Sequence, residues 1–122
     1  RDTNIARIGY VAGKLAHHGV AVLVAAISPY RQARDQVRAS VEVFVEVHVA
    51  APLPICAERD PKGLYAKALA GEIKHFTGVS DPYEPPLEPE IVLHTETESA
   101  DDSVHQVLAW LEDSRLTTAS GR

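Results

Sequence analysis

The chain has 122 residues, 45% of them hydrophobic, which is enough for one modest core and too little for two full domains. Its 12 Lys and Arg against 17 Asp and Glu give a net charge of -5, which excludes the clustered positive charge that nonspecific nucleic-acid binding needs. One cysteine, Cys56, excludes an internal disulfide, and the longest apolar run, residues 20–27, is too short to span a bilayer, so we expect a cytoplasmic protein without a membrane segment.

The first predicted element is an amphipathic helix. Thr3 is expected to cap it, and Gly19 is expected to end it after His17 and His18. Apolar residues recur between these ends at helical spacing: Ile5, Ile8, Val11, Ala12 and Leu15.

Two strands and a short helix are predicted next. Residues 20–27 are continuously apolar, as in a parallel strand covered on both faces, and they end at Ser28 and Pro29. Residues 32–38 are predicted to form a short polar helix, and residues 43–49 a second strand.

The second half alternates in the same way. Residues 52–58 favour a helical turn, residues 64–70 a helix, residues 75–89 a loop rich in Gly and Pro, and residues 91–93 a third strand. Ser99 is expected to cap a last helix with Asp101 and Asp102 in its first turn. The buried face of that helix is predicted to carry Val104, Val107, Leu108 and Leu111. We expect residues 117–122 to form a flexible tail.

Alternating helices and strands favour an α/β fold with a parallel sheet and right-handed crossovers, formed by residues 1–116. Three strings stand out within it. Arg1-Asp-Thr-Asn4-Ile-Ala-Arg7-Ile8 opens the first helix, and Ile27-Ser-Pro-Tyr-Arg31 ends the apolar strand. The third string runs from Arg59-Asp-Pro-Lys62-Gly-Leu-Tyr65 through Ala70-Gly-Glu-Ile-Lys74-His-Phe76-Thr-Gly78 to Asp81-Pro-Tyr83-Glu84.

In order and spacing these strings closely resemble the adenylylsulfate kinase family, from Arg1 to about Leu111. The resemblance implies a P-loop kinase fold with helices flanking a parallel sheet. It also implies ATP and Mg²⁺, with adenosine 5′-phosphosulfate as the phosphoryl acceptor. A homodimer, and a fusion or complex with an ATP sulfurylase component, are further implications.

The chain departs from the family pattern in what it lacks. Family members begin with a strand and a Gly-x-x-x-x-Gly-Lys-Ser loop, and neither is present in the 122 residues. That loop binds phosphate and magnesium during transfer, so we expect these residues alone to be inactive. The absent strand would lie between residues 20–27 and 43–49, and we expect the natural protein to supply it. Where the family usually has Gly, this chain has His75.

The resemblance implies an acceptor site formed by Arg1, Asn4, Ile27, Ser28, Phe76, Thr77 and Gly78. Alternatively, Arg1 is a solvated terminus and Asn4 an ordinary early helix residue. Phe76 is expected to stack on the acceptor adenine, because an aromatic ring in a polar loop has little core to join; the alternative is that it folds inward and anchors the loop.

Ser28 has two further interpretations. The family assigns this serine as a candidate phosphoserine intermediate, but a nucleophilic serine needs an adjacent base and no histidine lies near it in the sequence. Direct in-line transfer with Ser28 as a positioning group is simpler. A serine that only caps the following helix is the remaining alternative.

Two residues of the third string, Arg59 and Lys62, and the preceding Cys56 are assigned to the phosphoryl donor. Arg59 and Cys56 are expected beside the donor adenine, and Lys62 is expected to reach the transferring phosphate. A charged surface turn and a small buried thiol are the alternatives. The six histidines lack metal-ligand spacing, so no metal site is predicted among them.

The sequence thus predicts the acceptor-binding and lid part of an adenylylsulfate kinase. One alternative is a non-catalytic acceptor-binding or assembly module of a sulfate-activation protein. Another is a kinase for a different small hydroxyl acceptor.

Overall fold

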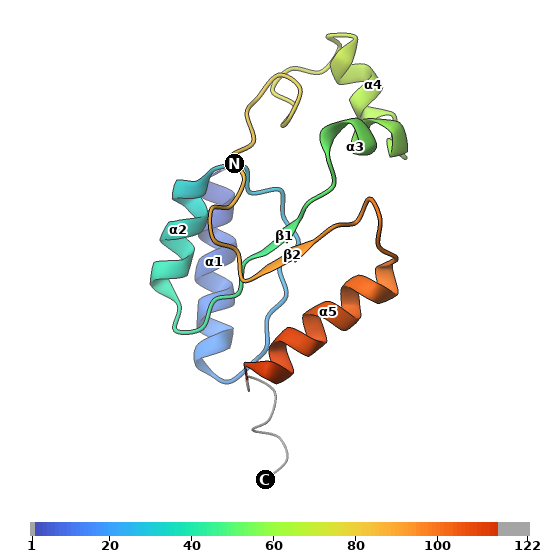
Figure 1. Ribbon diagram of the computed structural model, residues 1–122. Helices are drawn as coiled ribbons and strands as arrows, with labels where there is room; N and C mark the ends of the chain where they lie inside the picture. The colour runs from blue at the N-terminus through green and yellow to red at the C-terminus, as the bar shows by residue number, and fades with distance from the viewer. Residues whose placement is uncertain (1, 115–122) are drawn as a thin grey trace. The chain divides into compact units, whose positions relative to one another are not determined.

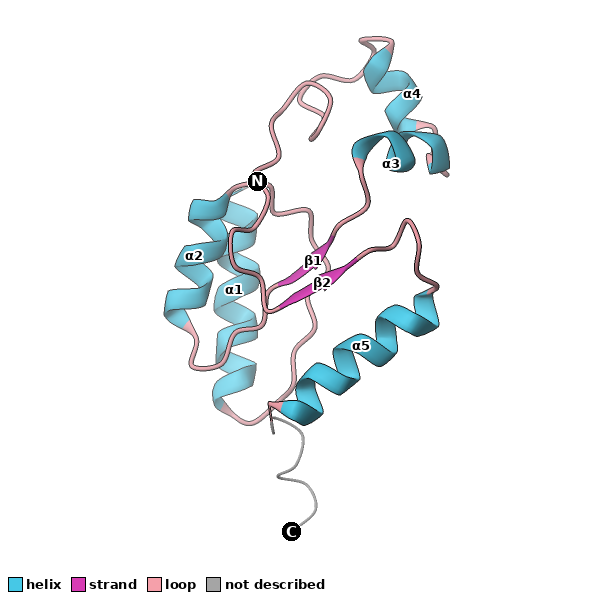
Figure 2. Ribbon diagram, in the orientation of Figure 1, coloured by secondary structure: helices cyan, strands magenta, loops and turns pink. Residues whose placement is uncertain are grey.

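The computed structural model describes residues 2–114, so Arg1 and the predicted tail at residues 117–122 lie outside the described part of the chain. Figures 1 and 2 show the elements in sequence. They are α1 (Asp2–His17), α2 (Arg31–Ser40), β1 (Val47–Val49), α3 (Leu53–Arg59), α4 (Leu64–Leu69), β2 (Ile91–Leu93) and α5 (Ala100–Asp113).

The chain divides into two compact units, which are described separately. Unit 1 comprises Arg1–Phe44 and His75–Leu87, and unit 2 comprises Val45–Lys74 and Glu88–Arg122. Unit 1 contains α1, α2 and residues 75–87 of the predicted loop, whereas unit 2 contains both strands and the other three helices.

The centre of unit 1 is a close contact between α1 and α2, which run side by side in the same direction (Figure 1). A Cβ atom added at Gly9 would lie 2.6 Å from Cγ2 of Val37, and one added at Gly13 would lie 3.1 Å from Cγ1 of Val41. The two helices can therefore approach this closely only because residue 9 has no side chain.

The N-terminal cap predicted for α1 is wrong. Thr3 already lies inside the helix, which includes Asp2. A capping residue has a non-helical backbone, so Thr3 cannot take that role. The carboxylate of Asp2 instead lies in the first turn, where the helix dipole favours negative charge.

The predicted strand at residues 20–27 is not formed within the described part of the chain. The segment is an extended loop between α1 and α2, and no strand among residues 2–114 pairs with it (Figure 2). It is not covered on both faces either, since Leu23 is 92% exposed and Ile27 67% exposed. A strand is defined by its ladder partner, and an apolar sequence cannot provide one alone.

Unit 2 is built on a parallel pair of strands (Figure 1). Val47, His48 and Val49 of β1 pair with Ile91, Val92 and Leu93 of β2. Residues 43–46 of the predicted second strand lie outside β1. The carbonyl of Glu46 still accepts from the amide of Ile91 at 3.2 Å, but its own amide donates to Oε1 of Glu90 at 2.7 Å. The third predicted strand, residues 91–93, is confirmed.

Helix α5 packs against β2, and its cap is the one predicted. Ser99 Oγ accepts from the amide of Asp102, and the Asp102 carboxylate accepts from the amide of Ser99, which forms a capping box. Ile91 and Leu93 are buried at 6% and 7% exposure.

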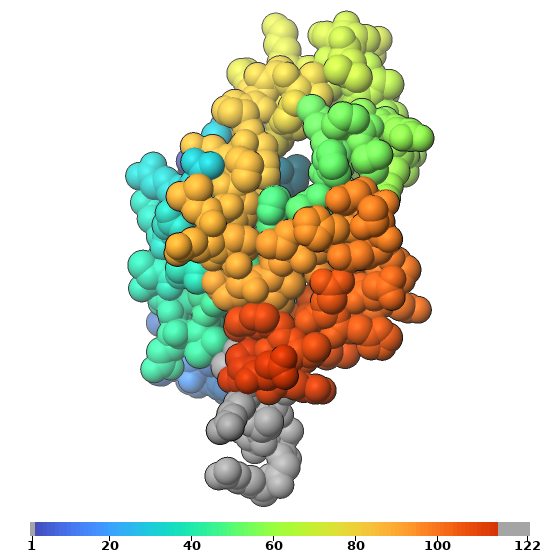
Figure 3. Space-filling view, in the orientation of Figure 1, coloured from blue at the N-terminus to red at the C-terminus, as the bar shows by residue number. Residues whose placement is uncertain are grey.

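The predicted buried face of α5 is only partly right. Val107 and Leu111 are half-buried, but Val104 is 54% and Leu108 48% exposed, while Ser103 is buried. The strand beneath is only three residues long, so it covers a narrow stripe of the helix. On the face seen in Figure 3, no other segment covers the side of α5 that is toward the viewer.

Helices α3 and α4 form where helical structure was predicted, and α4 ends before Gly71, which has a φ of 79°. Helices alternating with a parallel pair confirm the α/β class. Within residues 2–114 there is no helix with the length and apolar character needed to cross a membrane.

Candidate functional site

The residues expected to bind the acceptor all belong to unit 1, apart from Arg1, which is outside the described residues. Asn4 lies exposed in the first turn of α1. Ile27 and Ser28 precede α2. Phe76, Thr77 and Gly78 lie in the segment His75–Leu87, which the chain adds to this unit later.

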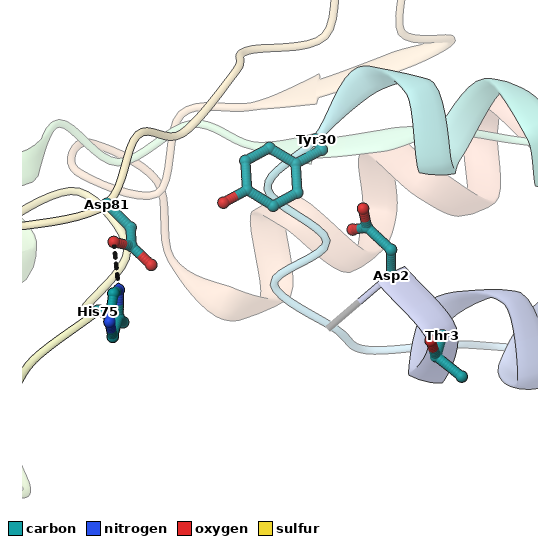
Figure 4. Close-up of a pocket in the computed structure, with 5 residues that line it drawn as sticks. All are labelled: Asp2, Thr3, Tyr30, His75 and Asp81. Atoms are coloured by element: carbon teal, nitrogen blue, oxygen red, sulfur yellow. Dashed lines mark hydrogen bonds and ion pairs between the residues drawn. The ribbon is translucent and has the colours of Figure 1, made fainter.

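A cavity of about 430 Å³ lies where these three segments meet. It is lined by Asp2, Thr3, Tyr30, His75 and Asp81. In Figure 4 the Tyr30 hydroxyl points toward the His75–Asp81 pair, while Asp2 and Thr3 approach from the start of α1. Each lining residue is a close sequence neighbour of a predicted acceptor residue, although none of them was itself predicted.

Ser28 has an unusual conformation. Its φ is 38°, a region that residues other than glycine rarely adopt and that costs of the order of 1–3 kcal/mol. Its carbonyl oxygen accepts a hydrogen bond from Nη1 of Arg34 at 2.6 Å. Its Oγ atom is buried and has no hydrogen-bond partner among residues 2–114. A buried hydroxyl without a partner is a candidate for contact with a ligand.

The backbone around Phe76 forms a tight turn. The Phe76 amide donates to Oγ of Ser80 at 2.7 Å, and its carbonyl accepts from the amides of Val79, Ser80 and Asp81. Gly78 has a φ of 88° and donates from its amide to the Asp81 carbonyl at 2.7 Å. The turn thus involves the three predicted residues through main-chain bonds, and the side chain of Phe76 is half-buried.

His75 occupies the position where the family usually has Gly. Its φ of 56° is one that a glycine would adopt without strain. The side chain is 83% exposed, and Nδ1 lies 3.2 Å from Oδ1 of Asp81 (Figure 4). The imidazole therefore links the start of the loop to Asp81 at the rim of the cavity.

The residues expected to bind the donor lie in unit 2. Arg59 is the last residue of α3, and its Nη2 donates to the carbonyl of Thr95 at 2.8 Å. Thr95 follows β2, so this bond connects α3 to a loop at the carboxyl end of the parallel pair, where α/β sheets commonly bind ligands. The sequence analysis missed this loop, because no string there stood out.

Cys56 lies one turn before Arg59 and is partly buried. Its Sγ donates to the Ala51 carbonyl at 3.6 Å. Burial raises the pKa of the neighbouring Tyr65 above its ordinary value, and the adjacent Cys56 side chain raises it further. These contacts are those of a packed thiol, and they leave its predicted adenine contact untested.

Lys62 is exposed in the turn between α3 and α4. The carboxylate of Asp60 fixes this turn by accepting from the amides of Tyr65 and Ala66, both at 3.0 Å. Desolvation raises the pKa of Asp60, but the backbone amides of Tyr65, Ala66 and Leu64 together outweigh it and hold the pKa below 3.8. Asp60 is thus held as a carboxylate beside a lysine whose side chain projects from a defined turn.

Comparison with known proteins places these observations in one family of enzymes. The family model described as adenylylsulphate kinase matches residues 1–94. The adenylyl-sulfate kinase of Rippkaea orientalis is 60% identical over 113 residues, which are 93% of this chain and 62% of that protein. The "probable bifunctional SAT/APS kinase 2" of Sorangium cellulosum is 55% identical over 93% of this chain and 19% of that protein.

A solved structure also matches. The Mycobacterium tuberculosis APS kinase CysC, in complex with AMPPNP and APS, has a TM-score of 0.86 and 44% identity, covering 92% of this chain and 66% of that one. The chain therefore spans about two thirds of the length of this structure and 62% of the Rippkaea protein.

Proposed function

The chain belongs to the adenylyl-sulfate kinase family, and we propose that it provides the acceptor pocket and lid of an enzyme that phosphorylates the 3′-hydroxyl of adenosine 5′-phosphosulfate. The observation that carries this proposal is the cavity of about 430 Å³ in unit 1. Pockets for small ligands usually measure about 300–1,000 Å³. This one lies where the segments of Asn4, Ser28 and Phe76 meet, and the Mycobacterium relative was solved with APS and AMPPNP together.

In the proposed reaction the acceptor 3′-oxygen attacks the γ-phosphorus of ATP. The new O–P bond forms as the bond to the β,γ-bridging oxygen breaks, ADP leaves, and the hydroxyl proton is released. Such transfers depend mainly on positioning and charge neutralisation. Phe76 would hold the adenine, and the unpartnered Oγ of Ser28 would orient the acceptor. A phosphoserine intermediate has less support, since no described base contacts that hydroxyl.

The donor side of the proposal rests on unit 2. The guanidinium of Arg59 and the exposed ammonium of Lys62 suit the adenine and the phosphates of ATP. Residues 2–114 contain no group of three or more His, Cys, Asp or Glu that could hold a metal ion. The ligands of Mg²⁺ are expected mainly in the Gly-x-x-x-x-Gly-Lys-Ser part that is not among the 122 residues, so no step is assigned to the ion here. A homodimer, and association with an ATP sulfurylase, remain proposals; the bifunctional name of the Sorangium relative supports the second.

The test compares two proteins in a coupled assay of ADP release. The full-length protein should release ADP only when adenosine 5′-phosphosulfate is present, and the 122-residue chain alone should release none, because it has no Gly-x-x-x-x-Gly-Lys-Ser loop. Turnover by the 122-residue chain would contradict its predicted inactivity. A full-length protein that binds the acceptor without turnover would instead favour a non-catalytic binding module.

A further inference from the structure

Two segments of the proposed acceptor site are far apart in the sequence, yet hydrogen bonds fasten them together within unit 1. The amide of Glu84 donates to the carbonyl of Pro29 at 2.8 Å. Pro29 follows Ser28, and Glu84 ends the string that begins with the Phe76 turn. The backbone on either side of the cavity is therefore joined at this point.

Arg34 of α2 contacts both sides of this junction. Its Nη1 donates to the Ser28 carbonyl at 2.6 Å, and its Nη2 donates to the Glu84 carbonyl at 2.6 Å. The guanidinium carbon lies 5.9 Å from the centre of the Tyr83 ring. A planar guanidinium can donate in two directions at once from a fixed fork, which the single ammonium of lysine cannot reproduce.

The Ser28 bond matters most, because Ser28 has a φ of 38° and a buried hydroxyl without a described partner. A strained residue keeps its conformation only where surrounding bonds hold it. The bond from Arg34 is short and charge-assisted, and it fixes the peptide that follows Ser28. It therefore helps to hold the backbone that carries the Oγ atom.

Helix α2 makes a second connection through Arg31. The amide of Arg31 donates to Oε1 of Glu84 at 2.9 Å, and its Nε donates to the Pro85 carbonyl at 2.7 Å. The start of α2 is thus the common anchor of the Ser28 turn and of the loop that ends at Glu84.

We propose that Arg34 is a positioning residue for the acceptor: by donating to the Ser28 and Glu84 carbonyls it holds the Ser28 turn and the Phe76 loop at the spacing that acceptor binding requires. The inference rests on the proposed function for the identity of the acceptor. In this proposal Arg34 acts through the two carbonyls rather than by contact with the acceptor. Loss of its fork should weaken binding of the acceptor and leave binding of ATP, whose expected residues lie in unit 2, unchanged.

The experiment uses the full-length protein with Arg34→Lys and Arg34→Gln. Arg38→Lys and Arg38→Gln are the matched controls, because Arg38 lies one turn later on α2 and its guanidinium contacts the Phe44 ring at 4.8 Å instead. We expect the KM for adenosine 5′-phosphosulfate to rise by about tenfold or more in Arg34→Gln, with the KM for ATP within about twofold of the parent. Arg34→Lys should give a KM for adenosine 5′-phosphosulfate between those of the parent and Arg34→Gln, since its ammonium keeps the positive charge and reaches one of the two carbonyls.

A second measurement needs no substrate. Hydrogen exchange of the Glu84 amide, which donates to Pro29, should be faster in the Arg34 variants and unchanged in the Arg38 controls. If the parent protein shows no turnover, the proposed function fails, but this exchange still decides whether Arg34 holds the junction.

Three results would overturn the inference. The first is exchange at Glu84 equal to that of the parent. The second is an equal rise in both KM values, which would indicate general destabilisation. The third is a change in the Arg38 controls as large as that in the Arg34 variants.

Discussion

The amide and the carbonyl of Phe76 both form hydrogen bonds within the turn, and none of these bonds involves its side chain. The amide and carbonyl of Phe76 bond to Ser80 and to the amides of residues 79–81, and these bonds do not depend on the ring. Removal of the ring should therefore leave the turn intact. A change in ligand binding can then be assigned to the ring itself.

In the full-length protein, we expect Phe76→Ala to weaken binding of adenosine 5′-phosphosulfate by about ten- to a hundredfold. Stacking of a base on an aromatic ring is worth about 1–3 kcal/mol, and each 1.4 kcal/mol is about a factor of ten. Affinity for ATP should change little. Titration calorimetry with each ligand measures both values.

Phe44→Leu is the control for loss of an aromatic ring, since Phe44 is the only other phenylalanine and packs against Arg38 in the same unit. It should leave both affinities unchanged. An equal loss for the two ligands in Phe76→Ala, or no loss for the acceptor, would show that Phe76 does not stack on it.

The helix pair α1–α2 depends on one missing side chain. In an ordinary helix Gly→Ala is stabilising by up to about 1 kcal/mol. At Gly9 the new Cβ would lie 2.6 Å and 2.9 Å from the two γ-carbons of Val37, a β-branched residue with little rotamer freedom. Overpacking of this kind costs about 1–3 kcal/mol, so Gly9→Ala should lower the free energy of unfolding by up to about 2 kcal/mol.

Urea unfolding of the double variant Gly9→Ala/Val37→Ala isolates the contact, because removing the γ-carbons should recover part of the loss in Gly9→Ala. Gly13→Ala is the matched control on the same helix. Its Cβ would approach Cγ1 of Val41 only to 3.1 Å, a distance that a small shift relieves. If Gly9→Ala proved as stable as Gly13→Ala, the close approach of the helices would be contradicted.

The capping box of α5 should make the stability of this helix depend on pH in the acidic range. The amide of Ser99, followed by its hydroxyl, holds the pKa of Asp102 below 3.8. A carboxyl group whose pKa is lower in the folded state stabilises that state above its ordinary pKa, and the contribution is lost as pH falls through the folded value. Asp102→Asn should therefore reduce the loss of α5 helicity between about pH 5 and pH 2.

Circular dichroism over this pH range compares the variant with Asp101→Asn, which removes a carboxylate from the same first turn but not from the capping box. The Asp101 variant should keep the acid transition of the parent near and below pH 3.8. An identical transition in parent and Asp102→Asn would show that the capping carboxylate does not contribute to it.

Local sequence signals predicted the helices well, and the family resemblance drawn from three strings is confirmed. A helix satisfies its backbone within its own segment, so the spacing of Ile5 and Ile8 or a Ser99 cap is sufficient evidence. The strand predicted at residues 20–27 was wrong for the opposite reason. A strand needs a partner from elsewhere, and no pattern within those eight residues indicates whether one is there.

The same distinction applies to the candidate site. The strings identified the three segments that meet at the cavity, yet they could not indicate that Arg34 bonds to the Glu84 carbonyl, because 50 residues separate the two. Nor could they indicate the φ of 38° at Ser28. Apolar spacing on α5 also failed to show that Val104 and Leu108 are exposed, because it does not reveal how long the strand beneath is.

At the scale of the whole molecule, the residues expected to bind the acceptor and those expected to bind the donor belong to different units of the chain. The expected acceptor residues lie in unit 1 and the expected donor residues in unit 2, and the chain passes between the units after Phe44, Lys74 and Leu87. The loop with the Phe76 turn begins where the chain re-enters unit 1 after Lys74 and ends where it leaves after Leu87. Acceptor and donor binding should accordingly respond separately to substitutions, as the Phe76 and Arg34 experiments assume.

The exposed apolar loop at residues 20–27 has a consequence for the 122-residue chain in concentrated solution. It contains no charge and no proline, is rich in valine, and presents Leu23 at 92% exposure. Short segments of this kind are templates for intermolecular cross-β assembly. We therefore expect the chain to form thioflavin-binding aggregates, and Leu23→Glu to delay them several-fold. The control is Leu87→Glu, which adds the same charge at a leucine that is 78% exposed but lies outside this segment, and it should not delay aggregation. An equal delay in both variants would mean that added charge alone, rather than interruption of residues 20–27, governs the colloidal stability of the chain.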